Sequence, residues 1–528
     1  MQDEGVIVIG GGVGGLVSAA LLAARGRDVT LLEAQPGPGG KLRAVTVEGT
    51  AIDAGPTVFT MRDVFHDIFA DCGSALEDHL TLRPATVLAR HAWGPRPDAD
   101  RLDLFADPAL SEAAIGDFAG AAEARGYRAF RAEARRLFEA LDRPFLRSPK
   151  ADPITLGWRM GAGGLPDYLN LRAYVSMSRA LSGYFADARL RQLFGRYATY
   201  SGSSPFACPA TLMLIAHVEA RGVWLIDGGM HRLAQALATL GRSNGVRFRY
   251  GTPVREILVE RGRAAGVVLA DGERLDAGAV ICNADPAAIG AGAFGASVRC
   301  AVTPTPAHRR SLSALVWTAR ARASGFPLSR HNVIFSDDYR AEFDALAAGR
   351  LAQAPSVYLC AQDRDATDDP PAPPGPERLQ IIVNAPANGD GAPLSSAEID
   401  RCTQAMLHSV SRAGLSLDLG DSAKLTTPSD FAAMFPSTGG ALYGPASHGW
   451  AASFRRQGSR TAIPGLYCAS GSTHPGAGVP MAALSARLAV ACLLADCRRW
   501  DRASTSWFSR TAMPGGISTR AAMTAPTA

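Results

Sequence analysis

A glycine-rich turn between a short apolar strand and a helix restricts the fold of this chain more than any other feature. Residues 6–9 (VIVI) form a fully apolar, β-branched run that is typical of a buried parallel strand. A G-x-G-x-x-G motif follows, residues 16–25 predict a helix, and residues 29–32 predict a second strand that Glu33 closes. This order of strand, glycines, helix, strand and acid predicts a dinucleotide-binding α/β fold.

Each part of the motif has a physical role. Gly10 permits the tight turn, Gly12 lets a pyrophosphate approach the backbone, and Gly15, next to Gly14, allows close packing of the helix on the strand. The helix N-terminus offers free N–H groups and the positive end of its dipole. Glu33 can accept hydrogen bonds from ribose hydroxyls, and its charge repels a 2′-phosphate. These residues do not decide between NAD and FAD, and the alternative is a glycine-rich loop without a ligand.

The same region has the length of a membrane span, because residues 6–24 carry no charge. Glycines interrupt this run, and the acidic flank (Asp3, Glu4) lacks the positive start of a signal peptide. We therefore expect a buried core segment here. No other stretch predicts a transmembrane helix, so any membrane contact is expected at the surface.

Composition narrows the class of protein further. The 528 residues exceed what one compact core usually contains, so we expect at least two domains. The formal net charge of +5 does not indicate a nucleic-acid partner, but it is compatible with an anionic membrane surface. The nine scattered cysteines include no C-x-x-C pair, which favours a reducing compartment over disulfides or a zinc site.

The middle of the chain alternates between helical and extended patterns. Apolar spacing predicts helices over residues 113–141, 171–186, 190–200, 211–219 and 231–240. Strands are predicted at 223–225, 246–250, 254–260, 266–269, 280–282, 314–319, 332–336, 356–360 and 379–384. The later strands, separated by loops, predict an antiparallel sheet in a second domain. Beyond Trp500 the composition predicts a frayed or disordered tail.

A second strand–turn–helix unit lies near the C-terminus. Residues 464–469 predict a strand, residues 471–480 form a turn rich in glycine and proline, and residues 481–494 predict a helix. Such a unit again exposes helix N–H groups to a bound anion, although an ordinary turn gives the same pattern. His474 is the histidine of this turn, and it either faces a substrate or satisfies the turn itself.

The two ends together resemble the bacterial phytoene-desaturase-type carotenoid desaturases. The run at 464–480 (PGLYCASGSTHPGAGVP) resembles the flavin segment of that family. The runs at 435–444 (FPSTGGALYG) and 481–485, with 191–200 and 204–206, look like the subgroup that acts on hydroxylated or methoxylated acyclic carotenoids. The methoxyneurosporene dehydrogenase or 1-hydroxycarotenoid 3,4-desaturase type represents this subgroup.

The resemblance implies an α/β fold, α+β overall, in which a Rossmann-like FAD-binding domain of the amine oxidase type joins a mixed antiparallel-sheet and helical substrate domain. It assigns residues 1–80, 221–290 and 450–500 to the FAD domain, 81–220 and 291–449 to the substrate domain, and 501–528 to the tail. It also implies that residues 283–286 return the chain toward the second domain. The cofactor-binding residues implied are Gly10, Gly12, Gly14, Gly15, Glu33, Ala34, Gly40, Lys41, Gly55, Pro56, Thr57, Val254, Gly471, Gly478, Val479 and Pro480.

The implied activity is desaturation of an acyclic carotenoid, with one hydrogen leaving as hydride to FAD and its neighbour as a proton. His474 is the candidate catalytic residue. Because carotenoids are insoluble in water, we expect a peripheral protein on the cytoplasmic side of the inner membrane, with oxygen or a quinone as electron acceptor. Three alternatives stay open: phytoene desaturase, a nicotinamide dehydrogenase, and a non-catalytic prenyl-binding protein of the same fold.

Overall fold

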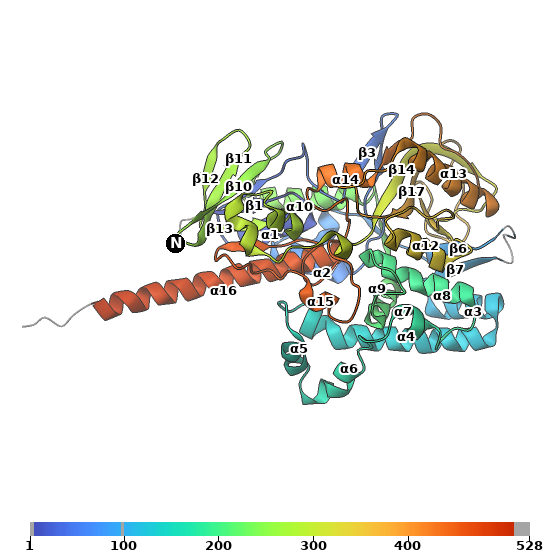
Figure 1. Ribbon diagram of the computed structural model, residues 1–528, viewed down its shortest axis with the longest axis horizontal. Helices are drawn as coiled ribbons and strands as arrows, with labels where there is room; N and C mark the ends of the chain where they lie inside the picture. The colour runs from blue at the N-terminus through green and yellow to red at the C-terminus, as the bar shows by residue number, and fades with distance from the viewer. Residues whose placement is uncertain (1–4, 95, 97–99, 512–528) are drawn as a thin grey trace, which may run out of the picture.

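The computed structural model describes residues 5–94, 96 and 100–511, with side chains described up to residue 498 (Figure 1). A five-stranded parallel sheet joins strands from distant parts of the chain. Its order is β20 (Leu466–Cys468), β13 (Ala279–Cys282), β1 (Val6–Ile9), β2 (Val29–Leu32) and β9 (Arg247–Arg249). The predicted strand–turn–helix units at the two ends of the chain therefore enter one sheet.

This sheet is the middle of three layers. Val6 and Val8 of β1 pack on one side against the helices α1 (Val13–Ala23), α10 (His231–Ser243) and α16 (Val479–Thr511). Ile7 and Ile9 point to the other side and pack against an antiparallel sheet. That sheet consists of β10 (Val254–Glu260), β11 (Arg263–Leu269) and β12 (Arg274–Asp276). Burial on both faces explains why β1 is apolar at every position.

A larger mixed sheet forms the second domain. Its eight strands run in the order β18 (Ser416–Asp418), β14 (Ser313–Ser324), β17 (Glu377–Ala385), β16 (Val357–Ala361), β15 (His331–Ile334), β6 (Val87–Ala92) and β7 (Arg101–Phe105), with β19 (Lys424–Thr426) beside β14. The pairs are antiparallel except for β15 with β6. Helix α13 (Ser396–Arg412) covers one face through Cys402, Met406 and Val410. The opposite face is free to line a site between the domains.

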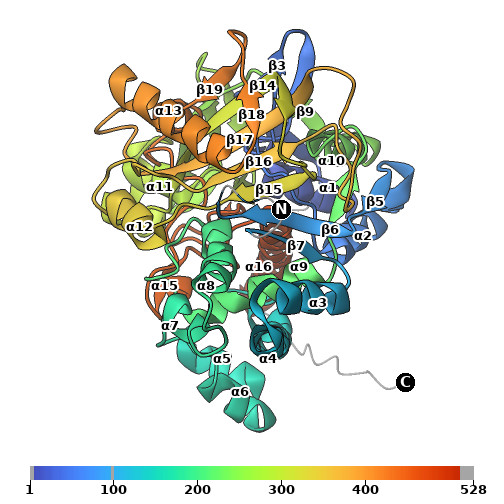
Figure 2. The same ribbon diagram turned by 90° about the vertical axis from the view of Figure 1, so that its right-hand side faces the viewer.

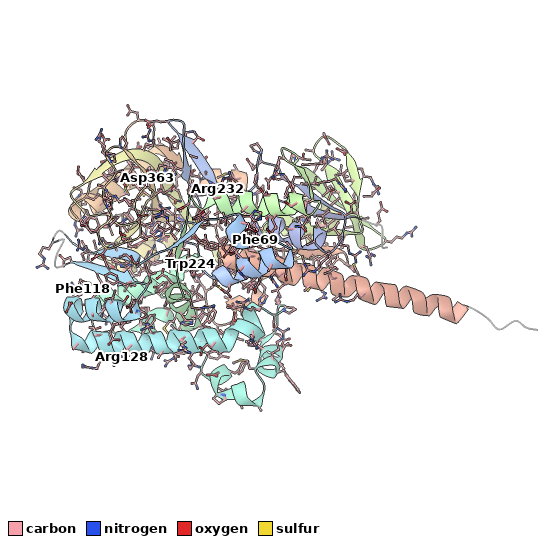
Figure 3. All side chains as sticks on the ribbon, turned by 180° about the vertical axis from the view of Figure 1, so that it is seen from behind. Phe69, Phe118, Arg128, Trp224, Arg232 and Asp363 are labelled. Carbon is pink, nitrogen blue, oxygen red and sulfur yellow. The ribbon has the colours of Figure 1, made fainter. Side chains whose placement is uncertain are left out.

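A helical lobe lies below both sheets in Figures 1 and 2. Figure 3 shows the molecule from behind, with Phe118 and Arg128 marking this lobe and Asp363 on the side of the larger sheet. The helices of the lobe are α3 (Pro108–Ala119), α4 (Ala121–Leu141), α5 (Pro153–Met160), α6 (Leu165–Leu169), α7 (Met177–Leu181), α8 (Ala188–Gly195) and α9 (Leu214–Ala220).

Smaller elements connect these layers. The helices are α2 (Arg62–Asp71), α11 (Pro286–Ala291), α12 (Tyr339–Ala347), α14 (Pro428–Met434) and α15 (Ala452–Arg455). The remaining strands are the hairpin β3 (Ala44–Val47) and β4 (Thr50–Asp53), and the pair β5 (Leu82–Pro84) and β8 (Trp224–Ile226).

Two of the predicted helices are wrong in their extent. The helix expected over 113–141 is two helices, α3 and α4, because Gly120 between them has φ of 97°. The helix expected over 171–186 is reduced to α7. Arg172 adopts φ of 55°, a left-handed conformation that cannot continue an α-helix.

The C-terminal helix is longer than expected. It continues to Thr511 and so includes residues 501–511 of the predicted tail, while residues 512–528 lie outside the described residues. Its segment Val479–Arg498 has the length and apolar composition of a membrane span, a candidate that the sequence reading did not expect. However, 67% of its most apolar window is buried inside the protein, and it packs against α1. Residues 6–24, the other suspected span, form β1 and α1.

Replacement of Gly15 tests the close packing of α1 on β1. A Cβ atom at this position would lie 1.9 Å from the carbonyl oxygen of Gly10, so Gly15→Ala must displace backbone. We expect destabilisation by about 1–3 kcal/mol, seen as a clear fall in the melting temperature. The control Gly375→Ala adds a Cβ with no atom within 4 Å and should leave that temperature nearly unchanged. Equal melting temperatures for the two variants would contradict this packing.

Candidate functional site

One cavity of about 1060 Å³ joins the parallel sheet, the larger sheet and the helical lobe. Sites for one small ligand usually occupy about 300–1,000 Å³, so this cavity lies at the upper end of that range and suits large ligands. The part near the parallel sheet is lined by glycine-rich turns, and the part near the larger sheet is lined by aliphatic and aromatic side chains. The two parts therefore suit ligands of different chemistry.

The N-terminus of α1 opens into the first part of the cavity. Gly12 is its N-cap residue, and no side chain caps the helix. The turn at residues 39–40 lies against it, because Gly12 pairs with Gly39 and a Cβ on Gly40 would lie 3.1 Å from the Gly12 Cα. Uncapped N–H groups beside a narrow glycine-lined passage fit an extended diphosphate.

Glu33 lies at the end of β2, where the sequence places the ribose acid. Its Oε2 accepts a hydrogen bond from the Gly11 N–H, and its Oε1 accepts one from the Gln35 N–H at 2.7 Å. The side chain is 8% exposed and lines the cavity. Each carboxylate oxygen keeps a further lone pair, so the group can still accept a ribose hydroxyl.

Most of the residues predicted to bind the cofactor line this one cavity. They are Gly10, Gly12, Glu33, Ala34, Gly40, Lys41, Gly55, Pro56, Thr57, Val254, Gly471, Gly478, Val479 and Pro480. Gly14 and Gly15 do not line it, and their contact with the cofactor stays a prediction. A Cβ on Gly14 would lie 2.5 Å from the Ala469 carbonyl oxygen and one on Gly15 1.9 Å from the Gly10 carbonyl oxygen, so both glycines serve close packing.

The start of α16 forms a second helix N-terminus on the cavity. Gly478, Val479 and Pro480 line the wall there, and Gly471 lies on the turn before them. A helix N-terminus stabilises negative charge nearby. The turn that the sequence singled out therefore faces the cavity.

Lys41 is held inside the site and is not a solvated surface charge. Its Nζ donates to the Leu442 carbonyl at 2.7 Å and lies 5.2 Å from the centre of the Phe435 ring. Burial lowers the pKa of Lys41, and the charge of Asp285 opposes this. The FPSTGGALYG run thus holds this lysine in place, and its residues Phe435, Pro436, Leu442 and Tyr443 also line the cavity.

Three polar residues at the site were missed by the sequence reasoning. Asn283 donates through Nδ2 to the Ala469 carbonyl, and its Oδ1 would lie 2.6 Å from a Cβ on Gly12, so it fixes the glycine turn. Asp285 also lines the cavity, and Arg456 donates to the carbonyls of Tyr443 and Pro445 at 2.9 and 2.8 Å. Burial lowers the pKa of Arg456 to about 10. The sequence did contain a signal for Asn283 and Asp285, because residues 283–285 directly follow the buried strand β13 and ligands bind at the carboxyl ends of parallel strands.

His474 does not face the cavity, and its prediction as a catalytic residue is wrong. Its side chain is buried, and Nε2 lies 3.0 Å from the Phe145 carbonyl and 2.9 Å from the Ser148 carbonyl. Burial lowers its pKa to about 4, so the ring is neutral near pH 7 and donates from Nε2. The histidine therefore ties the C-terminal turn to the helical lobe.

The second part of the cavity is largely apolar. The face of the larger sheet that α13 does not cover contributes alternate residues, and the helical lobe adds aliphatic side chains. These residues include Ala314, Val316, Val333, Phe335, Tyr339, Tyr358, Ile382, Leu146, Leu214, Ile215 and Val218. The period of two along β14 and β17 explains why one face lines the cavity and the other packs against α13.

The fold and the site together define an FAD-dependent oxidoreductase, because the diphosphate passage, ribose acid and second helix N-terminus fit this dinucleotide. The chain belongs to the flavin-containing amine oxidoreductase family, whose model matches residues 13–494.

Close relatives are carotenoid desaturases. The chain is 49% identical to the hydroxyneurosporene desaturase of Rubrivivax gelatinosus, over 99% of this chain and 98% of the relative. It is 48% identical to the protein of the same name from Cereibacter sphaeroides, over 93% and 97%. The 1-hydroxycarotenoid 3,4-desaturase of a Flavobacterium strain is 29% identical, over 91% and 97%.

Solved structures share the fold at low identity. An oxidoreductase from Methanosarcina mazei superposes with a TM-score of 0.57 at 16% identity, covering 91% of this chain and 98% of the other. Putrescine oxidase bound to putrescine gives 0.55 at 14% identity, covering 94% and 99%. These likenesses confirm the expected amine oxidase-type α/β fold.

Replacement of Glu33 tests the cofactor end of the cavity. Glu33→Gln keeps the size of the side chain but removes one of the two carboxylate oxygens that accept backbone N–H groups and that we expect to accept a ribose hydroxyl. We expect the dissociation constant for FAD to rise about tenfold or more, because hydrogen bonds to charged groups contribute about 1.5–3 kcal/mol. Flavin fluorescence during titration of the apoprotein measures this change. The control Glu139→Gln lies on an exposed face of α4, and equal affinities for both variants would contradict the role of Glu33.

Proposed function

We propose that this protein is an FAD-dependent carotenoid desaturase that introduces a carbon–carbon double bond into a hydroxylated or methoxylated acyclic carotenoid. The observation that carries the proposal is the single cavity that joins the dinucleotide end to a long apolar end. The names of the relatives, hydroxyneurosporene desaturase and 1-hydroxycarotenoid 3,4-desaturase, support this class of substrate.

FAD, when bound, supplies the two-electron acceptor that a desaturation needs. The protein supplies position and a dry environment. The aliphatic and aromatic wall excludes water and aligns the long hydrocarbon chain along the face of the larger sheet. The polyene next to the reacting bond spreads the positive charge that develops there, so a strong protein base is not required.

The rival activities differ in what they leave unexplained. A nicotinamide dehydrogenase accounts for the first glycine turn but not for the second helix N-terminus on the cavity. A prenyl-binding protein without catalysis has no need of the diphosphate passage and Glu33. Phytoene desaturase is the nearest alternative, and its substrate is a hydrocarbon that carries no oxygen at its end.

Product analysis separates these alternatives. The FAD-loaded protein should convert hydroxyneurosporene to a product with one more conjugated double bond, seen as a shift of absorption to longer wavelength and the loss of two hydrogens in mass. Conversion of phytoene should be at least tenfold slower, because a site built for a polar group rejects an analogue that lacks it. Equal or faster conversion of phytoene would favour phytoene desaturase.

We further propose a peripheral position on the cytoplasmic face of the membrane, from which the carotenoid enters, with oxygen or a quinone as electron acceptor. Exposed apolar side chains gather on α5, α6 and the following loop. Trp158 is 83% and Ile154 75% exposed, and Leu165, Leu169 and Tyr174 continue the surface. Exposed Arg143, Lys150, Arg159, Arg172 and Arg179 lie in the same segment. Apolar side chains beside cations suit an anionic lipid surface.

This surface follows the cavity wall along the chain, because Leu146 lines the cavity and α5 begins at Pro153. The double variant Trp158→Glu/Leu169→Glu should reduce flotation with anionic phosphatidylglycerol vesicles at least tenfold, since each buried apolar side chain contributes about 1.5–3 kcal/mol. The control Leu110→Glu replaces a 53% exposed residue on α3 and should float normally. Unchanged flotation of the double variant would contradict this docking surface.

A further inference from the structure

A polar cluster lies within the apolar part of the cavity. Its centre is Arg196, which lines the cavity with Tyr200, Glu219 and Tyr358. The Arg196 Nη1 donates to the Tyr200 hydroxyl at 3.2 Å, and that hydroxyl donates to Glu219 Oε1 at 3.0 Å. The guanidinium carbon lies 5.2 Å from the ring centres of both Tyr200 and Tyr358. Two aromatic rings and one hydroxyl therefore hold the cation in place.

Arg196 has donors to spare. Its bond to Tyr200 is the one hydrogen bond that its guanidinium makes among the described residues, and none of their carboxylates lies within 4.0 Å of it. A guanidinium carries several N–H donors, and leaving them unpaired away from water is unfavourable. In the largely apolar part of the cavity, such donors indicate an acceptor on the ligand.

The cluster lies beside the cofactor end of the cavity. The Tyr358 hydroxyl is 2.6 Å from Thr57 Oγ1 and 2.8 Å from His331 Nδ1. Thr57 belongs to the segment 55–57 that lines the cofactor part. The cluster is thus linked by one hydrogen bond to the segment that we assign to the flavin.

The proposed substrate carries a hydrogen-bond acceptor close to its reacting bond. One relative is named a 1-hydroxycarotenoid 3,4-desaturase. By this name, its reacting bond begins only two carbons from the carbon that bears oxygen. The group that binds this oxygen must therefore lie close to the reacting carbons. A donor such as Arg196 can bind a hydroxyl or a methoxyl oxygen equally, because both oxygens accept hydrogen bonds.

We propose that Arg196, held by Tyr200 and Tyr358, binds the oxygen at C1 of the carotenoid and so selects oxygenated ends over hydrocarbon ends. The proposal rests on the proposed function, because it names a determinant of the substrate within the same cavity. Arg196 contacts the substrate, whereas Tyr200 and Tyr358 are positioning residues.

Binding to the reduced holoenzyme tests the proposal without turnover. The FAD-loaded protein is reduced chemically, and quenching of tryptophan fluorescence gives dissociation constants for hydroxyneurosporene and for neurosporene, its hydrocarbon parent. Arg196→Met should raise the constant for hydroxyneurosporene about 10- to 100-fold and change that for neurosporene less than about twofold. FAD affinity and the flavin spectrum should stay as in the unmodified protein.

Two further variants keep the test decisive if Arg196→Met does not fold. Arg196→Lys retains a cationic donor and should keep part of the preference for the oxygenated ligand. Tyr200→Phe removes the hydroxyl that holds the guanidinium and should lower the preference less than Arg196→Met. The control Arg131→Met removes a guanidinium that lies 5.6 Å from the Tyr127 ring outside the cavity, and should change neither constant.

The outcomes distinguish this inference from the proposed function. An equal loss of affinity for both carotenoids, or a retained preference in Arg196→Met, would overturn the role of Arg196 while leaving the desaturase proposal intact. A changed FAD affinity with unchanged carotenoid binding would assign Arg196 to the cofactor instead. Failure of the unmodified protein to bind hydroxyneurosporene would overturn both.

Discussion

The close approach of backbone to backbone around the first glycine turn supports the rest of the structure. Gly15 brings α1 onto β1, Gly14 brings it against the end of β20, and Asn283 ties the turn to Ala469. These contacts join the two ends of the chain at one edge of the parallel sheet. That edge holds the N-termini of α1 and α16, and both face one cavity. A side chain on Gly14 or Gly15 would therefore move apart the two helix N-termini that a dinucleotide bridges.

The second constraint is the period of two in the larger sheet. One face of β14 and β17 packs against α13, and the other face becomes the wall of the cavity. The helical lobe lies below this sheet (Figure 2), and its Leu214, Ile215 and Val218 add to the cavity wall. The apolar part of the cavity thereby begins next to the segment 55–57, and Arg196 lies within it as a cation. The helical lobe that completes this part of the cavity also carries the exposed Trp158.

Much of this could be predicted from the sequence because the signals are local. The first strand, glycines, helix and Glu33 follow one another within about thirty residues, and the C-terminal turn has the same form. Contacts between distant segments left no such signal. The sequence pattern did not show that the Nε2 of His474 meets carbonyls of the helical lobe, or that Arg196 stacks on Tyr358. Arg172 likewise ended a predicted helix through its backbone conformation.

The central claim is that one cavity places a hydroxylated acyclic carotenoid against bound FAD. Anaerobic mixing of the FAD-loaded protein with hydroxyneurosporene, followed by rapid absorbance spectroscopy, tests it most directly. The account predicts that the oxidised flavin band is lost at the same rate as the longer polyene appears, in equal amounts. A flavin that stays oxidised while the carotenoid is bound would contradict the account.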